Sequence, residues 1–496
     1  MRAILLLLIG LFVLLSACKK DSRNVNIESS SYQIENISLP DGLVGETGAI
    51  EFLPDGRLVA CFLRGEIMIY DPQKSIWSVF ASGLHEPLGL MIVNEYEMMV
   101  MQRPELTRLS DTDHDGKADV YETVTDEFGM TGNYHEWNYG PVKDKQGNLY
   151  IGLNTASEYG IIQKEIRGIL DTTLVPARPL QKFSAVPYRG WIMKLTPDGN
   201  LIPFASGLRS PNGLVLDSRD QLFVTDNQGD WVGTSVLYHI EENKFYGHPA
   251  SLLWQKDWNK GDPSKLPIKV LDSMRTRGAV LFPHGIIAAS PSQPVIDNSN
   301  GQFGPFTNQF FIGEMNQERI IRVMLEEIGG QWQGACIPFI DKHGLLKGIN
   351  RLAFSPDGSL WVGHAQHGFI GDLGIQKISY TGKMPMDIHT LHLLKNGFDV
   401  NFTLPVHDSI SIDSSMVHIR HYYYDYHLKY GSDQYDVKKV ELLASVLSAD
   451  RKRLRISLPE IKPGYIYEFT FSGIRSDAGI GLENKLVCYT VNRIVP

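Results

Sequence analysis

Residues 80–90 read FASGLHEPLGL, and residues 204–214 read FASGLRSPNGL, so one frame occurs twice in the chain. A second phrase recurs around this frame: an apolar pair, a polar turn with Asp or Gly, and an alternating strand. Examples begin at Ile50, Val142, Leu214 and Leu352. Each phrase predicts two strands joined by a tight turn. Repeated short strands with regular turn signals are typical of a β-propeller.

The sequence predicts an all-β chain with two folded parts. Residues 31–382 form the first part, a six-bladed β-propeller. We expect its blades at roughly 47–81, 82–125, 135–206, 207–250, 282–340 and 348–382. Two long loops, 155–187 and 251–281, interrupt the pattern, and loops of such length often cover a site. Residues 383–496 lack the phrase but keep alternating strands, which predict an Ig-like β-sandwich.

The composition is that of a soluble globular protein, with 43% hydrophobic and 21% charged residues. The formal net charge is −9 and no basic patch stands out, so nucleic acid is excluded as an expected partner. The four cysteines form no CxxC pair, which excludes zinc ribbons, thioredoxin chemistry and c-type haem. Cys61, Cys336 and Cys488 lie in apolar runs, so we expect buried free thiols.

The first residues predict the location of the protein. The apolar run at residues 4–15 is shorter than the ~20 residues of a membrane-spanning helix and matches a secretory signal peptide over residues 1–17. Leu-Ser-Ala before Cys18 resembles a bacterial lipobox, so we expect Cys18 to be lipidated and residues 18–30 to form a tether. Acyl chains would hold the protein at the cell envelope, outside the cytoplasm, at the outer membrane or surface. The alternative is an ordinary signal peptide with a chance cysteine.

Residues 111–122 read DTDHDGKADVYE and have the spacing of a calcium loop. The acidic positions are Asp111, Asp113, Asp115, Asp119 and Glu122. In an EF-hand-like loop these residues surround Ca²⁺ with carboxylate oxygens, Lys117 adds its backbone carbonyl and Gly116 permits the sharp turn. The acids would saturate the ion, so we expect a structural Ca²⁺ site. The alternative is an empty acidic surface turn.

The blade phrases resemble those of the glucose/sorbosone dehydrogenase family, six-bladed propellers related to soluble PQQ-dependent sugar dehydrogenases. The residues that carry the resemblance are GLRSPNGL at 207–214, DNQGD at 226–230, FYGHP at 245–249, HGIIAASP at 284–291 and NQFFIG at 308–313. Together with the lipobox and the acidic loop, the chain is most similar to a lipoprotein subgroup called membrane-bound dehydrogenases. The resemblance implies oxidation of a sugar or sugar-derived hydroxyl or aldehyde, with PQQ as cofactor.

The resemblance also implies which residues form the site. It implies that His135 takes the hydroxyl proton, for which the imidazole must be neutral near pH 7. It implies that Arg209 is a catalytic and cofactor-binding residue, a suitable partner for a quinone carboxylate. Further cofactor-binding positions implied in this way are Asn212, His284, Asn350 and Arg351. The chain departs from the family pattern at Ser210, where the family has asparagine, and at Asn350, where it tends to have arginine.

Other interpretations of these residues stay open. Arg209 could form an ion pair with Asp226 or Asp230, and His135 could be a satisfied structural histidine. A set of oxygen ligands also resembles the metal site of gluconolactonase-like propellers, where a divalent cation would act on a lactone. This set consists of Glu46, Asn138, Asn212 and Asp226.

A third class of function is a non-catalytic propeller that holds a sugar or glycan. The tyrosines at 422–424, with Tyr426 and Tyr430, could stack on carbohydrate in such a protein. Cross-strand packing of the rings is the alternative.

Overall fold

The computed structural model of the chain describes residues 31–158, 162, 167–170, 181–366 and 371–496. The predicted signal peptide, Cys18 and the tether up to residue 30 lie outside the described residues. Helices are few in the described part: one α-helix, α1 (Ile268–Met274), and two 3₁₀ helices, η1 (Pro249–Trp254) and η2 (Pro263–Lys265). The all-β prediction is therefore confirmed. None of these helices has the length and hydropathy needed to cross a membrane.

Antiparallel four-stranded sheets follow one another along the first part of the chain. The first two sheets comprise β2 (Thr47–Phe52), β3 (Leu58–Phe62), β4 (Ile67–Asp71) and β5 (Ile76–Ala81), then β6 (Gly89–Asn94), β7 (Glu97–Met101), β8 (Leu106–Ser110) and β9 (Val120–Thr125). The next two comprise β10 (Asn138–Lys143), β11 (Leu149–Leu153), β14 (Trp191–Leu195) and β15 (Leu201–Ser206), then β16 (Pro211–Leu216), β17 (Leu222–Asp226), β19 (Ser235–Ile240) and β20 (Val280–Phe282).

Two further groups of strands complete a ring. The fifth group comprises β21 (Pro291–Ile296), β22 (Phe310–Glu314), β23 (Ile320–Ile328) and β24 (Gln331–Phe339), and the sixth β25 (Ile349–Phe354), β26 (Leu360–His364), β27 (Gly374–Tyr380) and β1 (Tyr32–Ile37). The short strands β12 (Ala156–Ser157) and β13 (Lys182–Phe183) pair separately, and β18 (Asp230–Val232) pairs with a distant strand.

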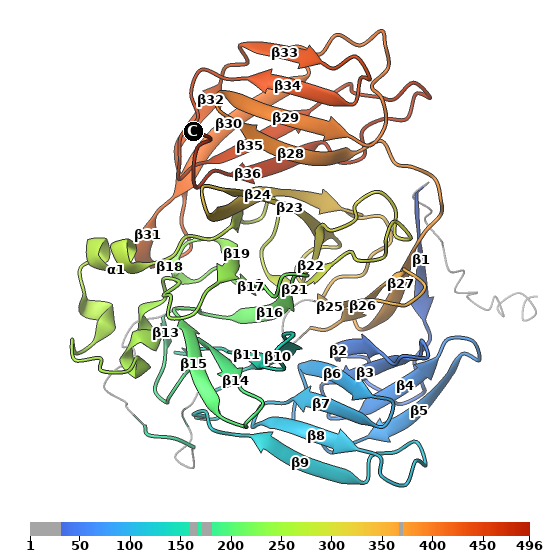
Figure 1. Cartoon of the computed structure of the whole chain (residues 1–496), viewed down its shortest axis with the longest axis vertical. Coiled ribbons are helices and arrows are strands. Elements are labelled where there is room, and N and C mark those ends of the chain that lie inside the picture. Colours follow the sequence, from blue (N-terminus) through green and yellow to red (C-terminus); the bar gives the residue numbers. More distant parts are fainter. Residues whose placement is uncertain (1–30, 159–161, 163–166, 171–180, 367–370) are drawn as a thin grey trace, which may run out of the picture.

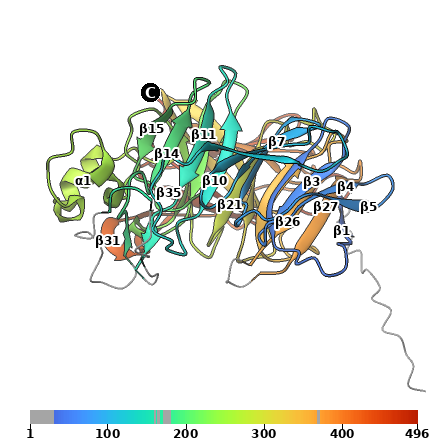
Figure 2. The same ribbon diagram turned by 90° about the horizontal axis from the view of Figure 1, so that it is seen from below.

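The first strands of the six sheets face one another around a common axis. In chain order β2, β6, β10, β16, β21 and β25 each contact the next, and β25 contacts β2 (Figure 1). Figure 2 shows the same sheets from below. β1 pairs antiparallel with β27, from Tyr32 opposite Tyr380 to Ile37 opposite Ile375. The sixth sheet thus contains strands from both ends of this part of the chain, and this pairing closes the ring.

The repeated sequence frame has a structural reason in both copies. Gly83 and Gly207 have φ of 82° and 90°, a left-handed conformation that glycine adopts without strain. Gly89 and Gly213 lie where the first strands of neighbouring sheets meet. A Cβ at Gly89 would lie 1.5 Å from the Gly140 carbonyl oxygen, and one at Gly213 would lie 2.4 Å from the Gln293 Cα. The shared glycines of the frame are therefore required by the architecture.

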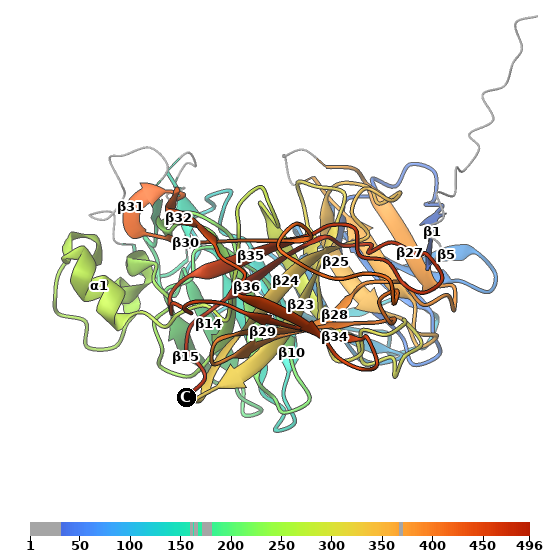
Figure 3. The ribbon, with the colours of Figure 1, turned by 90° about the horizontal axis from the view of Figure 1, so that it is seen from above.

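Residues 388–490 form two layers of strands. One is the sheet of β28 (Ile388–Leu394), β29 (Gly397–Phe402), β34 (Arg453–Ser457) and β33 (Ala444–Leu447). The other consists of β36 (Leu486–Thr490), β35 (Ile466–Phe471), β30 (Val417–Tyr424) and β32 (Gln434–Val440), and it continues from β24 as one eight-stranded sheet with the fifth sheet of the ring. A common core joins the two parts, because Met324, Ala335 and Ile337 of the ring pack with the residues between these layers. Figure 3 shows β23 and β24, which carry them, next to β36 and β28.

The three described cysteines are buried and free, as their apolar surroundings predicted. Cys336 on β24 lies directly opposite Cys488 on β36, at the junction of the two parts.

A buried arginine, Arg322, also connects the two parts at this junction. Arg322 on β23 donates through Nη2 to an Asp387 carboxylate oxygen at 3.1 Å and to the Ile388 carbonyl at 2.6 Å. Its guanidinium stacks on the Phe306 ring, with 3.8 Å between Cζ and the ring centroid. Burial raises the pKa of Asp387 and lowers that of Arg322, and the opposite charge of each partner acts against this shift.

We predict that Arg322→Ala lowers the free energy of unfolding by about 3–5 kcal/mol, because Asp387 would remain buried without its partner. The measurement is urea unfolding followed by tryptophan fluorescence. The control is Arg219→Ala, whose exposed pair with Asp217 should contribute less than about 1 kcal/mol. Equal effects of the two substitutions would contradict a structural role for the buried pair.

Candidate functional site

His135 lies in the turn just before β10, and hydrogen bonds from three sides fix this turn. Arg103 donates to the carbonyls of Asn133 at 2.9 Å and Tyr134 at 2.6 Å. The Asn133 side-chain oxygen accepts from the backbone N–H of His135 at 3.1 Å and from that of Ser157 at 3.0 Å. The backbone of this turn is therefore held by Arg103, which lies between β7 and β8, and through Asn133 by Ser157 on β12.

The hydrogen bond of the His135 ring defines its protonation. Nδ1 lies 2.7 Å from the Thr155 carbonyl oxygen, which can only accept, so Nδ1 carries the hydrogen and Nε2 has the lone pair. Burial holds the pKa of His135 well below its usual range, and the charges of Arg209, Lys182 and Arg103 lower it further. The imidazole is consequently a neutral base at pH 7.

Thr155 also connects His135 to Arg209. Its N–H and Oγ1 donate to the Arg209 carbonyl at 3.1 and 2.9 Å. Asp226 then fixes the backbone from the other side, accepting from the N–H groups of Arg209 at 2.9 Å and Ser210 at 2.6 Å. Asp226 binds the backbone of Arg209 and forms no ion pair with its guanidinium within the described residues. Nε of Arg209 is buried without a hydrogen-bond partner.

Two residues that the sequence analysis missed adjoin this pair. Burial lowers the pKa of Lys182 on β13 to about 8, with a further contribution from the charge of Arg209. Nζ of Lys182 donates to Ser157 Oγ at 2.9 Å and lies 3.6 Å from a Glu158 carboxylate oxygen. Lys182 and Glu158 lie in the long loop predicted at 155–187, and no local sequence pattern relates that loop to His135. Only the length of the loop indicated that it could cover a site.

Asp230 and His248 form a buried pair beside Lys182. Asp230 accepts from the Lys182 backbone N–H at 3.1 Å, and its other oxygen lies 3.2 Å from Nε2 of His248. Asp230 therefore holds the backbone that carries Lys182. We call His135, Arg209, Lys182 and Glu158 the His135 cluster.

Asn212, Asn350 and Arg351 lie together on the axis of the ring, apart from the hydrogen bonds that hold His135. Arg351 is 3% exposed and donates to the carbonyls of Gly48 at 2.8 Å, Leu88 at 3.1 Å and Asn212 at 3.2 Å. Asn350 donates to the Thr47 carbonyl at 2.9 Å. These side-chain donors of Asn350 and Arg351 are used within the protein. They are therefore not free to bind a cofactor, the role that the sequence analysis expected of both residues.

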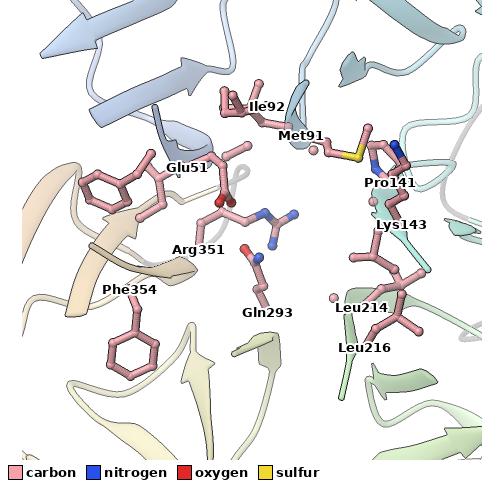
Figure 4. A pocket seen from close by; sticks show the side chains of 18 of the residues that line it. Glu51, Met91, Ile92, Pro141, Lys143, Leu214, Leu216, Gln293, Arg351 and Phe354 are labelled. Atoms are coloured by element: carbon pink, nitrogen blue, oxygen red, sulfur yellow. The ribbon is translucent and has the colours of Figure 1, made fainter. Parts of the chain in front are cut away.

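A cavity of about 940 Å³ extends along the axis toward the other ends of the first strands. Glu51, Gln293 and Arg351 point toward its middle, and Leu214, Leu216 and Met91 lie around them (Figure 4). Desolvation raises the pKa of Glu51 to about 7. Neither His135 nor Arg209 lines this cavity.

The set proposed for a lactonase metal is engaged in other bonds. The Asn138 side-chain oxygen accepts from the Arg189 guanidinium at 2.7 Å, and a cation in that position repels a metal ion. Both Asp226 oxygens accept backbone N–H groups, and the Asn212 amide donates to Met315 Sδ at 3.8 Å. The structure favours structural roles for these side chains.

Two other histidines lie away from the cluster. His284 is exposed and, within the described residues, shows no contact with His135 or Arg209. His364 on β26 is fully buried, with Nδ1 3.0 Å from the Lys347 carbonyl oxygen and Nε2 without a partner. Burial lowers the pKa of His364 to about 4.

The acidic loop brings part of the predicted calcium set together. One carboxylate oxygen each from Asp111, Asp113 and Asp115 lies within 4.8 Å of the others. Asp119 accepts from the Thr112 hydroxyl, and Glu122 lies on β9, 3.2 Å from Arg108. Three of the five acids thus converge, whereas Glu122 is paired elsewhere.

Comparisons with known proteins identify a family and a general likeness of shape. A family model described as a domain of unknown function (DUF7133) matches residues 71–372. No curated protein matches the sequence. Similar solved structures include the PQQ-bound aldose sugar dehydrogenase of Streptomyces coelicolor, 17% identical over 70% of this chain and 98% of that one, with a TM-score of 0.46. A glucose dehydrogenase is 16% identical over 71% and 99%, with a TM-score of 0.49. A calcium structure of a Trichoderma reesei carbohydrate-active enzyme of family AA12 is 12% identical over 71% and 96%, with a TM-score of 0.48.

We predict that His364 makes the protein less stable in acid. The unfolded histidine binds a proton below about pH 6.5, whereas the folded one stays neutral down to about pH 4, so the unfolded state binds more protons in this window. Stability should therefore fall as the pH falls through it, by about 2–3 kcal/mol at pH 4.5.

The test compares urea unfolding at pH 7 and pH 4.5. His364→Gln should remove this part of the pH dependence, and the exposed His343→Gln should keep it. An unchanged pH dependence in His364→Gln would contradict the prediction.

Proposed function

The chain belongs to the family described as a domain of unknown function (DUF7133), and from the His135 cluster we propose that it is a sugar oxidoreductase that uses a quinone cofactor. The substrate would be a sugar or a sugar-derived hydroxyl or aldehyde. The observation that carries the proposal is the bond from the His135 ring to the Thr155 carbonyl.

That bond supplies a general base in the required state. Because Nδ1 is the donor, Nε2 is the atom that would take a proton from a substrate hydroxyl. The low pKa keeps Nε2 unprotonated at neutral pH, and the fixed turn around Asn133 orients it. The neighbouring charges of Arg209 and Lys182 would stabilise an alkoxide that forms there.

The donor set also fits PQQ, which carries carboxylates. Arg209 has a buried Nε without a partner and would hold a carboxylate of the cofactor, and Lys182, which lies 3.6 Å from a Glu158 oxygen, adds a positive charge nearby. When bound, the quinone would accept the hydride that leaves the substrate carbon. Asp226 and Thr155 fix the backbone of Arg209, and they would thereby position the guanidinium for this contact.

We predict that His135→Gln lowers kcat of PQQ-dependent sugar oxidation at least about 100-fold while PQQ affinity stays within threefold, since the base acts only in proton transfer. Arg209→Ala should instead weaken PQQ binding about 10- to 100-fold, because it removes a charge-assisted contact. The measurements are calorimetric titration with PQQ and a dye-reduction assay across sugars.

The exposed residues His418 and Arg453 provide the controls, and His418→Gln and Arg453→Ala should behave as the unchanged protein. If the unchanged protein binds no PQQ, the proposal is wrong. Sugar binding without turnover would then favour the non-catalytic glycan-binding alternative.

We propose in addition that the acidic loop binds a structural Ca²⁺. Three carboxylates within 4.8 Å repel one another unless a cation lies between them. The loop also precedes β9, and the Ala118 N–H donates to the Phe80 carbonyl of β5 at 2.8 Å. A bound ion would therefore stiffen the contact between the first and second sheets.

We predict that Ca²⁺ raises the melting temperature of the metal-depleted protein by about 2 °C or more, because the ion binds the folded loop. Asp111→Asn combined with Asp113→Asn should abolish the increase, since two ligand charges are lost. The exposed Asp55→Asn is the control and should leave it unchanged. An increase that persists in the double variant would place the ion elsewhere.

We further propose that the ring is a six-bladed β-propeller and that residues 383–496 form an Ig-like domain. The six sheets around one axis support the first statement. The lipobox at Cys18 supports a lipid anchor at the outside of the bacterial cell envelope, where the protein would meet small sugars or glycans.

A further inference from the structure

A strand from the C-terminal part of the chain is added to the ring beside the His135 cluster. β31 (Tyr426–Tyr430) pairs antiparallel with β18, with Tyr430 opposite Asp230. A further backbone bond extends the pairing, from the Gly431 N–H to the Gly229 carbonyl at 2.9 Å, and the Ser432 N–H donates to the Gly233 carbonyl at 3.0 Å. β31 thus lies at the ring beside β18, away from the two layers of its own domain (Figure 1).

Side chains at the start of β31 fix the strand on the ring. Tyr426 donates its hydroxyl hydrogen to the Gly247 carbonyl, and its ring lies 5.7 Å from that of Trp231. The Arg275 guanidinium lies over the Tyr426 ring, with 4.5 Å between Cζ and the ring centroid. These contacts are buried, so the strand has a fixed register on β18.

The end of β31 meets the cluster through Tyr430. The Arg209 guanidinium lies over the Tyr430 ring, with 5.6 Å between Cζ and the ring centroid. Gly229 makes room for this approach, because a Cβ there would lie 2.3 Å from Cδ of Arg209. Tyr430 is 40% exposed, so its ring is covered on the side of Arg209 and open elsewhere.

A residue of β18 also positions Lys182, the second cation of the cluster. Asp230, the residue opposite Tyr430, accepts from the Lys182 backbone N–H. The positions of both Arg209 and Lys182 therefore depend on the β18–β31 pair, and no ion pair with an acidic side chain holds the Arg209 guanidinium within the described residues.

We propose that the site is shared between the two parts of the chain and that Tyr430 is its positioning residue for Arg209. The ring face of Tyr430 holds the guanidinium by a cation–π contact and leaves its N–H groups free for the carboxylate of a bound ligand. An acidic partner in the same place would neutralise the charge, whereas an aromatic ring orients it and preserves it. This inference rests on the proposed function for the identity of the ligand, but the contact itself does not.

The first test measures ligand affinity with PQQ as probe. Tyr430→Ala should weaken PQQ binding about 3- to 30-fold, the range of a cation–π contact. Tyr430→Phe keeps the ring face and should bind within twofold of the unchanged protein. The matched control is Tyr435→Ala, since Tyr435 stacks on Tyr423 within the C-terminal domain. Equal affinity in all four proteins, or a Phe variant as weak as the Ala variant, would overturn the proposal.

The second test does not depend on PQQ. Phenylglyoxal modifies accessible guanidinium groups, and peptide mass spectrometry gives the rate at Arg209. Loss of the covering ring should make Arg209 react at least threefold faster in Tyr430→Ala, but not in Tyr430→Phe or Tyr435→Ala. If PQQ does not bind at all, the proposed cofactor fails while this rate still decides the role of Tyr430. Equal rates in Tyr430→Ala and the unchanged protein would overturn it.

Discussion

The close approach of the first strands at the axis is the constraint on which the rest of the ring depends. A Cβ at Gly48 would lie 1.9 Å from the Pro87 carbonyl oxygen, so the strands meet there without side chains. Their carbonyls at this level need donors, because buried carbonyls without partners are strongly unfavourable. Arg351 on the sixth sheet supplies these donors to the first, second and fourth sheets and stacks on Tyr139 of the third, 4.9 Å from its centroid. One guanidinium thus connects five sheets.

This use of Arg351 divides the axis into two environments. On one side lies the cavity with Glu51 and Gln293, and on the other lie the turns that precede the first strands. The close approach of the strands does not restrict those turns, because their residues precede in sequence the positions where the first strands meet at the axis. His135 and Arg209 occupy two such turns, in the third and fourth sheets. The chemistry can therefore vary at these turns without disturbing the packing at the axis.

Local patterns in the sequence were sufficient to predict the all-β architecture. Turn glycines and alternating strands indicated it, and the repeated frame contained the positions where a Cβ would clash. His135 and Arg209 were predicted as site residues because the family resemblance implies them. The same resemblance implied a cofactor role for Asn350 and Arg351, whose donors are used at the axis. Which donors are left free depends on contacts between sheets, and a sequence pattern does not contain these.

The residues that the sequence could not assign to the site share one property: they reach it from a distance. Lys182 comes from a long loop and Tyr430 from a strand more than 200 residues beyond Arg209. Lys182 is placed by a bond from its backbone N–H to the Asp230 carboxylate, and Tyr430 by backbone pairing along β18. Neither interaction leaves a local pattern in the sequence around Lys182 or Tyr430. The tyrosine run was recognised as either a sugar platform or cross-strand packing. Tyr423 and Tyr435 do pack, 5.8 Å apart, whereas Tyr430 lies against a cation of another domain. The same residue type thus has two roles within one segment, and the neighbour across the domain boundary decides between them.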